Sequence, residues 1–85
     1  MIQAELAELE TLSRKLGTCS GEVEDLKRAL TSLISTTTWS GGAAERFRHA
    51  WEGQFRPALD GLARELVNAS QEVDRRKVAL DHAGN

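Results

Sequence analysis

The side chains best suited to catalysis or metal binding are few in this sequence, which contains two histidines and one cysteine. His49 and His82 fall on one long helical pattern, where a rise of 1.5 Å per residue separates them by roughly 50 Å. Neither histidine has a serine or cysteine at a spacing that suggests a nucleophile pair. A zinc site of ordinary ligand count would have to recruit carboxylates. The sequence therefore predicts no catalytic residues, no metal site and no cofactor.

Three weaker motifs do not change this conclusion. Gly41-Gly42 precedes a helical pattern and could receive an anion, but it lacks the glycine spacing and the lysine of a phosphate loop. Asn68-Ala69-Ser70 matches a glycosylation triplet, yet it falls within a predicted helix. The basic run 75–77 is short and flanked by acidic residues. With 11 basic and 13 acidic residues, the net charge of −2 argues against a general nucleic-acid or anionic-membrane partner.

The beginning of the chain does not resemble a secretory leader. Residues 1–5 are acidic and amphipathic, without a basic region, an apolar run or a cleavage site. No apolar stretch approaches the roughly 20 residues that span a bilayer, so we expect no membrane insertion. We expect that if the protein leaves the cell, its route needs no cleaved leader.

Length and composition indicate one small all-α domain covering residues 1–85. The four aromatic residues, two Trp and two Phe, all lie between Trp39 and Phe55, so whatever they pack against is local to the middle of the chain. The single proline and the lack of turn residues argue against an all-β domain.

The first half carries an apolar stripe with alternating spacings of three and four residues, which is typical of one helix face. Its members are Leu9, Leu12, Leu16, Cys19, Val23, Leu26, Leu30 and Leu33. The stripe predicts a helix over about residues 2–37. Gly17 and Gly21 leave three alternatives open, namely a soft point in a continuous helix, a break near Gly17, or a close-approach site for a partner helix.

The first helix should end in the run 35–38, because its three consecutive threonines lose rotamer freedom in a helix. A turn over about residues 38–42 follows, with Ser40 as the expected N-cap of the next helix. Gly41 and Gly42 permit the positive φ that a tight reversal needs. Since the connection is short, the two helices should be antiparallel neighbours.

The second half predicts a helix over about residues 43–81. Phe47, Trp51, Phe55 and Leu59 form one row at a spacing of four residues, and the stripe then continues through Leu62, Leu66, Ala69, Val73 and Leu80. Pro57 presses on the carbonyl of Gly53. A kink, a break into two consecutive helices and an undisturbed helix all remain possible.

A two-helix hairpin would leave part of both stripes exposed, and a chain this small usually needs a partner for stability. The simplest solution is a four-helix bundle built from two hairpins. The expected partner is therefore a second copy or a similar helical hairpin. Cys19 would act as a small apolar filler or as a disulfide between two chains.

A heptad helix, a central Trp39-Ser40-Gly41 turn and a second heptad helix together resemble the WXG hundred-residue family, the early-secreted-antigen-like hairpins of type VII secretion. Ala43-Ala44, Phe47, Trp51 and the leucine series after Pro57 also carry the resemblance. It covers nearly the whole chain. The resemblance implies a dimeric four-helix bundle, made in the bacterial cytoplasm and exported folded without a cleaved leader. Possible further partners are a larger type VII effector and the secretion ATPase.

The resemblance also implies that Trp39 and Gly41 contribute to a recognition surface beside the partner's C-terminal export signal. Family members with that signal have Tyr-x-x-x-Asp/Glu after the second helix, whereas this chain has no tyrosine and places Val73 and Lys77 there. Either a partner supplies the signal or the chain stays in the cytoplasm as a partner or chaperone. The alternative function is a cytoplasmic coiled-coil adaptor unconnected with secretion.

Overall fold

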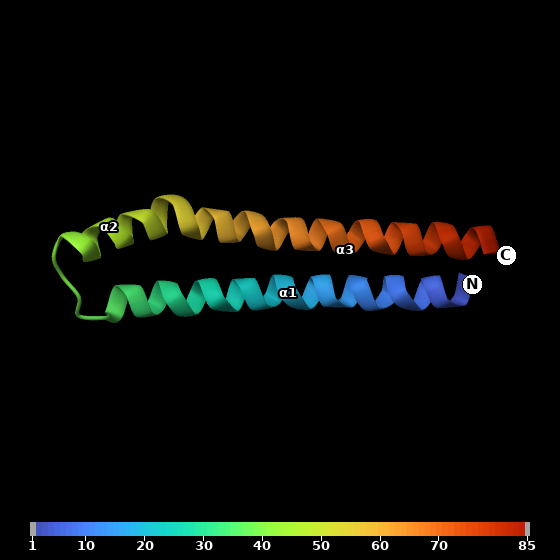
Figure 1. The fold of residues 1–85 in the computed structure, drawn as a ribbon, viewed down its shortest axis with the longest axis horizontal. Coiled ribbons are helices and arrows are strands. Elements are labelled where there is room, and N and C mark those ends of the chain that lie inside the picture. Colours follow the sequence, from blue (N-terminus) through green and yellow to red (C-terminus); the bar gives the residue numbers. More distant parts are fainter. Residues whose placement is uncertain (1, 85) are drawn as a thin grey trace.

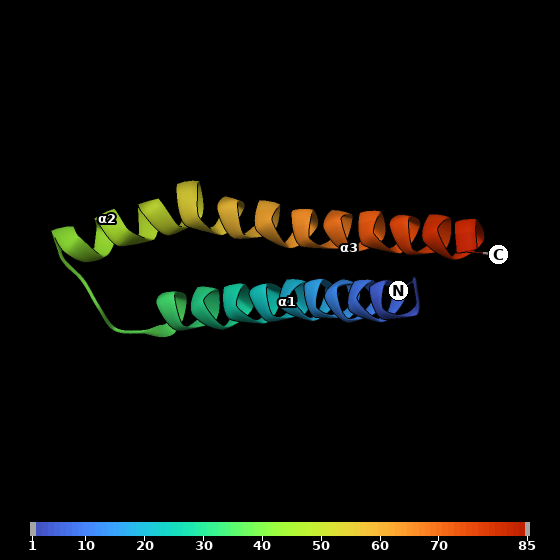
Figure 2. The same ribbon diagram turned by 45° about the vertical axis from the view of Figure 1, so that its right-hand side comes forward.

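Two long helical arms lie antiparallel along their whole length in the computed structural model, which describes residues 2–84. Helix α1 spans Ile2–Thr36 and forms the first arm. The second arm contains helix α2 (Gly42–Ala50), the π-helical turn η1 (Trp51–Phe55) and helix α3 (Arg56–Gly84). The hairpin measures 64 × 17 × 14 Å, and its two chain ends lie together at the end away from the turn (Figures 1 and 2). No strand occurs among residues 2–84, so the predicted all-α hairpin is confirmed.

Helix α1 is continuous through both of its glycines. A Cβ atom added at Gly17 or Gly21 would meet nothing within 4 Å, so neither glycine is required for close approach within this chain. Of the three alternatives that the sequence left open, the continuous helix is the one observed. The helix ends where the Thr37 N–H donates to the Leu33 carbonyl at 2.9 Å.

The reversal between the arms depends on Gly41. Its φ of 103° lies in the region that favours glycine, and no other described residue has a positive φ. Gly41 is the N-cap of α2, and its carbonyl accepts the Glu45 N–H at 3.1 Å. The expected N-cap Ser40 is therefore wrong, because no side chain caps this helix and the turn places the cap one residue later.

The bend expected near Gly53 and Pro57 takes the form of the π turn η1, where the ribbon bulges between α2 and α3 (Figure 1). The Arg56 N–H donates to the Trp51 carbonyl, five residues back instead of four. Proline cannot donate a backbone hydrogen bond, so Pro57 leaves a gap in the regular α-helical ladder just after this turn. The wider turn accommodates the proline without breaking the arm in two.

The interior of the hairpin is thin. Ala44, Trp51 and Ala63 are its buried apolar residues, and no large side chain among those described is completely enclosed. The accessible surface is 6131 Å², whereas a compact monomer of 9.3 kDa exposes roughly 5,000 Å². Among residues 2–84, none of the helices combines the length and apolar character that crossing a bilayer requires.

Candidate interaction surface

The apolar stripe of α1 does not face a single neighbour. Four half-buried members form a central row with a spacing of seven residues, namely Leu9, Leu16, Val23 and Leu30. The remaining members form an outer row, in which Cys19 is half-buried and the leucines are exposed: Leu12, Cys19, Leu26 and Leu33. A third row, which the sequence analysis did not select, faces the second arm: Leu6, Ser13, Ser20, Lys27 and Ile34.

The seam between the arms is held by small polar side chains. The Ser13 hydroxyl donates to Asp74 Oδ1 at 2.6 Å, and the Ser70 hydroxyl donates to the Ser13 carbonyl at 3.2 Å. Two helical turns further along α1, the Ser20 hydroxyl donates to the Ala63 carbonyl at 2.9 Å. Serine and alanine let two helix backbones approach closely, so side-chain hydroxyls can reach carbonyls of the other arm. We use the term seam for this contact between the arms.

An ion pair lies in the same seam nearer to the turn. Lys27 of α1 contacts Asp60 of α3 and also lies 3.0 Å from Glu24. The hydrogen bond between Lys27 and Asp60 lowers the pKa of Asp60 and raises the pKa of Lys27. Both shifts favour the charged forms, so the pair stays ionised across the neutral range.

Helix α3 repeats the arrangement of α1. Its half-buried central row contains Leu59, Leu66, Val73 and Leu80. The row that faces α1 contains Arg56, Ala63, Ser70 and Lys77. The outer row contains Phe55, Leu62 and Ala69, of which Phe55 and Leu62 are exposed.

The two outer rows lie on the same side of the hairpin. A step of three residues rotates by about −60° around a helix axis, and a step of four rotates by about +40°. In both arms the seam row lies four residues after the central row, and the outer row lies three after it. Because the arms are antiparallel, equal rotations turn both outer rows to one side. We call the two outer rows, with the central rows between them, the apolar face.

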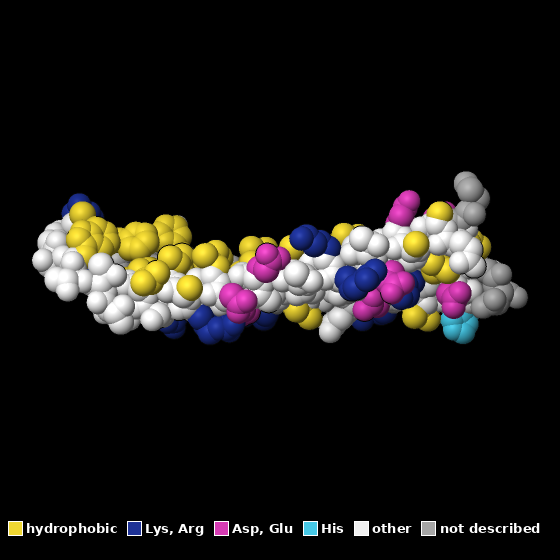
Figure 3. All heavy atoms as spheres, turned by 90° about the horizontal axis from the view of Figure 1, so that it is seen from below, with side chains coloured by type: hydrophobic (Ala, Val, Ile, Leu, Met, Phe, Trp, Pro, Cys, Tyr) yellow, Lys and Arg dark blue, Asp and Glu magenta, His cyan; other side chains and the backbone are white. Residues whose placement is uncertain are grey.

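Figure 3 shows apolar side chains near the turn gathered along one long edge of the molecule, whereas basic side chains lie at several places on this view, including the opposite edge. The leucines of the outer rows are well exposed, and Leu33 reaches 58%. Large apolar side chains exposed together on one face of a small protein are typical of an association surface.

The π turn keeps the aromatic residues in register with this face. Within α3, equivalent positions recur every seven residues. Across the π turn they are eight residues apart, so Trp51 in the turn corresponds to Leu59 and Phe47 in α2 corresponds to Phe55. Without the extra residue of η1, Glu52 would occupy the position of Trp51. Since a heptad pattern cannot contain a spacing of eight, the π turn explains the irregular spacing.

The four residues of the predicted row differ in how far they are buried. Trp51 is 4% exposed in the seam, and its indole N–H donates to Thr31 Oγ1 at 3.1 Å. Phe47 and Phe55 instead belong to the apolar face and are 38% and 41% exposed. The extra residue in the π turn changes the direction of each side chain beyond it, which a regular spacing of four does not predict.

Three exposed aromatic rings meet at the turn. The ring centroids of Trp39 and Phe47 are 6.0 Å apart, and those of Phe47 and Phe55 are 6.4 Å apart. Both pairs of rings are tilted, an arrangement that aromatic pairs commonly adopt. We call Trp39, Phe47 and Phe55 the turn cluster, and it forms the aromatic end of the apolar face.

The Trp39-Ser40-Gly41 sequence lies in this turn, and a family profile matches the chain around it. The profile is that of WXG100, described as proteins of 100 residues with WXG, and it matches residues 1–84. The chain belongs to the WXG100 family. It is thereby one of the small helical proteins associated with type VII secretion, which are not known enzymes and have helical hairpin partners. WXG100 proteins are secreted without a signal peptide. No curated protein and no solved structure matches the chain.

The most important side chain that sequence reasoning missed in this WXG100 hairpin is Arg48. It lies on α2, yet its guanidinium contacts the end of α1 and the turn. No local pattern reveals this role, because the carbonyls that it binds are 9 to 14 residues earlier in the chain. The seam serines did carry a signal, since Ser13, Ser20 and Ser70 recur at multiples of seven with the apolar rows.

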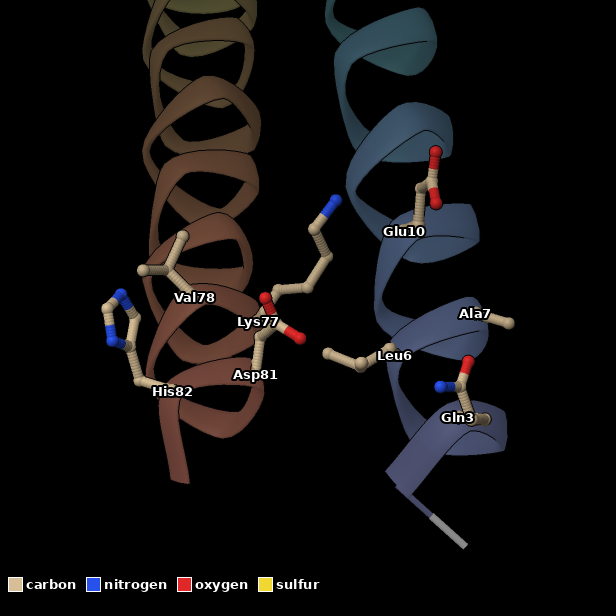
Figure 4. Close-up of a pocket in the computed structure, with 8 residues that line it drawn as sticks. All are labelled: Gln3, Leu6, Ala7, Glu10, Lys77, Val78, Asp81 and His82. Atoms are coloured by element: carbon tan, nitrogen blue, oxygen red, sulfur yellow. The ribbon is translucent and has the colours of Figure 1, made fainter. Parts of the chain in front are cut away.

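A shallow hollow at the open end of the WXG100 hairpin offers no reactive centre. It is lined from both arms by polar residues that include Glu10, Lys77 and Asp81. Figure 4 shows Asp81 and Leu6 between the arms, whereas His82 points away from α1. Within residues 2–84, no three His, Cys, Asp or Glu side chains are grouped so that they could hold a metal ion.

Proposed function

We propose that this protein is a non-enzymatic type VII secretion substrate or co-secreted partner that acts by packing its apolar face against a second helical hairpin. The observation that carries the proposal is the uncovered outer row of α1 beside that of α3. Both rows are apolar, both lie on one side, and their leucines and Phe55 are 41–58% exposed. Family membership supports the link with secretion.

The partner that fits this face is a hairpin with the same construction, either a second copy or a related chain. Two such faces together would cover four central rows and four outer rows, which is the core of a four-helix bundle. Covering them would also remove the excess accessible surface of the isolated chain, which stabilises association through the hydrophobic effect. Such a core is apolar throughout, whereas the seam within one hairpin is partly polar.

Trp39 and Gly41 have separate parts in this proposal. Gly41 closes the turn through its positive φ. Trp39 is 45% exposed within the turn cluster and presents an aromatic surface to a partner. Since the chain contains no tyrosine, the C-terminal export signal would come from the partner hairpin or from a larger type VII effector, and the secretion ATPase would engage that complex. The protein would then leave the cell with its partner after synthesis in the cytoplasm.

The decisive experiment compares charges introduced on opposite faces. Leu26→Glu places a carboxylate in the outer row of α1, and Val67→Glu places one on the other face of the hairpin, where Val67 lies beside Arg64 and Asn68. Sedimentation of the purified chain, alone and with co-expressed hairpins, should show that Leu26→Glu abolishes association and Val67→Glu does not. A well-folded monomer at micromolar concentration, with no partner captured, would contradict the proposal.

A second candidate is a cytoplasmic coiled-coil adaptor unconnected with secretion, which the missing tyrosine favours. The two functions share the apolar face, so association alone does not distinguish them. Export from the native host does, because a co-secreted partner appears outside the cell and an adaptor does not. A type VII ATPase or a large toxin encoded next to the protein would favour the first function.

A further inference from the structure

The last turn of α1 lacks the donors that helix ends usually provide. The final carbonyls of a helix have no partner within it, and α1 has no basic residue in its last turn. Local groups satisfy two of these carbonyls, because the Thr36 hydroxyl donates to Ser32 at 2.8 Å and the Thr37 N–H donates to Leu33. The carbonyls of Ile34, Thr37 and Trp39 receive their hydrogen bonds from the other arm.

A single side chain, Arg48, serves all three of these carbonyls. Its Nη1 donates to the Trp39 carbonyl at 2.6 Å, and its Nη2 donates to the Thr37 carbonyl at 3.1 Å. Its Nε and Nη2 also donate to the Ile34 carbonyl at 3.3 and 3.2 Å. A planar guanidinium has five N–H donors in a fixed fork, so it can bridge three carbonyls at once. A lysine ammonium is a compact point charge and cannot copy this geometry.

The same guanidinium also contacts the indole of Trp39. Its central carbon lies 5.8 Å from the Trp39 ring, within the range of a cation–π interaction. Phe47 contacts the indole as well, with a centroid separation of 6.0 Å. Trp39 is thus held at its carbonyl and at its ring while almost half of its surface stays exposed. Arg48 itself is half-buried in the row that faces α1 and is not part of the apolar face.

We propose that Arg48 is a positioning residue that fixes the Trp39 indole in the orientation in which a partner hairpin binds it. This inference rests on the proposed function, since it gives Trp39 a part in partner binding. Arg48 acts from inside the turn and does not touch the partner. Fixing an exposed aromatic side chain before binding strengthens association, because less rotational freedom is lost on binding.

The test compares Arg48→Lys with Arg46→Lys, which changes an exposed arginine two residues earlier on α2. Both proteins are prepared with 5-fluorotryptophan, so that Trp39 and Trp51 give separate ¹⁹F signals. We expect Arg48→Lys to move or broaden the Trp39 signal while the Trp51 signal stays unchanged. Self-association of the full chain should weaken by about tenfold. Arg46→Lys should change neither the signals nor the association.

A double-mutant cycle distinguishes positioning from general stabilisation of the turn. If Arg48 acts through Trp39, the double variant Arg48→Lys/Trp39→Ala should associate no more weakly than Trp39→Ala alone. If the two substitutions weaken association independently, so that their fold-changes multiply in the double variant, the inference is overturned. An unchanged Trp39 signal in Arg48→Lys would also overturn it. If Arg48→Lys loses helicity, Arg48→Gln is taken through the same cycle, and loss of helicity in both variants would assign Arg48 to folding and also overturn the inference.

The result for Trp39→Ala separates the two levels of the argument. If Trp39→Ala leaves association and export unchanged, Trp39 has no part in recognition, and both that element of the proposed function and the present inference fail. If Trp39→Ala weakens association by tenfold or more but Arg48→Lys does not, the proposed function stands and only the role of Arg48 is overturned.

Discussion

The seam and the apolar face use the same two helices in opposite ways. The seam joins the arms through serine hydroxyls and an ion pair, with contacts such as Ser20 to Ala63 and Lys27 to Asp60. The apolar face consists of aliphatic side chains and aromatic rings, and the large side chains of its outer rows are 38–58% exposed. Directional hydrogen bonds define one register for the arms, whereas apolar area supplies non-directional free energy. The chain therefore uses polar groups to orient its arms and leaves much of its apolar area exposed, as the proposed association requires.

The contrast is not uniform along the hairpin. Near the turn the seam contains Trp51, which adds a large buried ring to a contact made elsewhere by small side chains. The apolar face is also aromatic at that end, with Phe47 and Phe55. The turn half thus carries most of the packing on both sides, and changes there should have the largest effects.

The largest expected effect is the loss of the Trp51 ring. Trp51→Ala should lower the free energy of unfolding by about 3–5 kcal/mol, because it opens a cavity in the seam and removes the hydrogen bond to Thr31. Chemical denaturation with helicity as the signal measures the change. Val67→Ala, on the exposed polar side, serves as the control and should alter the midpoint little. A small shift for Trp51→Ala would show that the thin core is not what stabilises the hairpin.

A pair of deletions tests the register argument. Removing Gly53 together with Pro57→Ala eliminates the extra residue of the π turn and restores a spacing of seven between Trp51 and Leu59. We expect a regular helix with Trp51 still buried and the unfolding free energy raised by about 1–3 kcal/mol. Removing Gly61 within regular α3 should instead destabilise the hairpin strongly, because it rotates the whole turn half out of register. Equal effects of the two deletions would refute the explanation of η1.

A smaller effect is expected in the polar part of the seam. Ser20→Ala removes the hydrogen bond to the Ala63 carbonyl and should cost about 0.5–1.5 kcal/mol of unfolding free energy. Leu12→Ala, in the outer row, should mainly weaken association. Denaturation and sedimentation of both variants would measure the two quantities separately. If Ser20→Ala weakened association more than Leu12→Ala, the division between seam and apolar face would be wrong.

The smallest effect concerns the Lys27–Asp60 pair. Its hydrogen bond lowers the pKa of Asp60 below the ordinary 3.8, so its stabilisation is present above that value and is lost as the pH falls through the folded-state pKa. The pKa of Lys27 is raised above 10.5. The stabilisation that comes from charged Lys27 is therefore lost only as the pH rises beyond this value. Urea denaturation between pH 2 and 5 should show a shallower acid loss in Asp60→Asn than in Asp25→Asn. Identical acid limbs would show that the pair contributes nothing.

The sequence was sufficient to predict the hairpin and its turn, because both features depend on local patterns. Heptad leucines define each arm, and Trp39-Ser40-Gly41 marks the reversal. The same pattern could not show which rows face the other arm, since Leu12 and Leu16 are equally apolar and their spacing fits either contact. The answer lies in Ser13 and Ser20, whose hydroxyls bind the opposite helix.

Two features of the interaction surface required the three-dimensional structure. The π turn depends on how the arm accommodates Pro57 while Trp51 stays in the seam, and this balance involves residues on both arms. The contacts of Arg48 depend on carbonyls that come close only after the chain has reversed. Both are tertiary effects, which periodicity in one helix does not encode.

The slender outline of the hairpin has a consequence for movement through a confined passage. Its radius of gyration is 18.8 Å, compared with about 12 Å for a globular protein of 85 residues. Travelling lengthwise, the folded chain presents a narrow cross-section, which measures 17 × 14 Å between its outermost backbone positions. A channel with the bore of two helices would therefore admit the single hairpin without unfolding, whereas the four-helix bundle proposed above would need a bore of four helices.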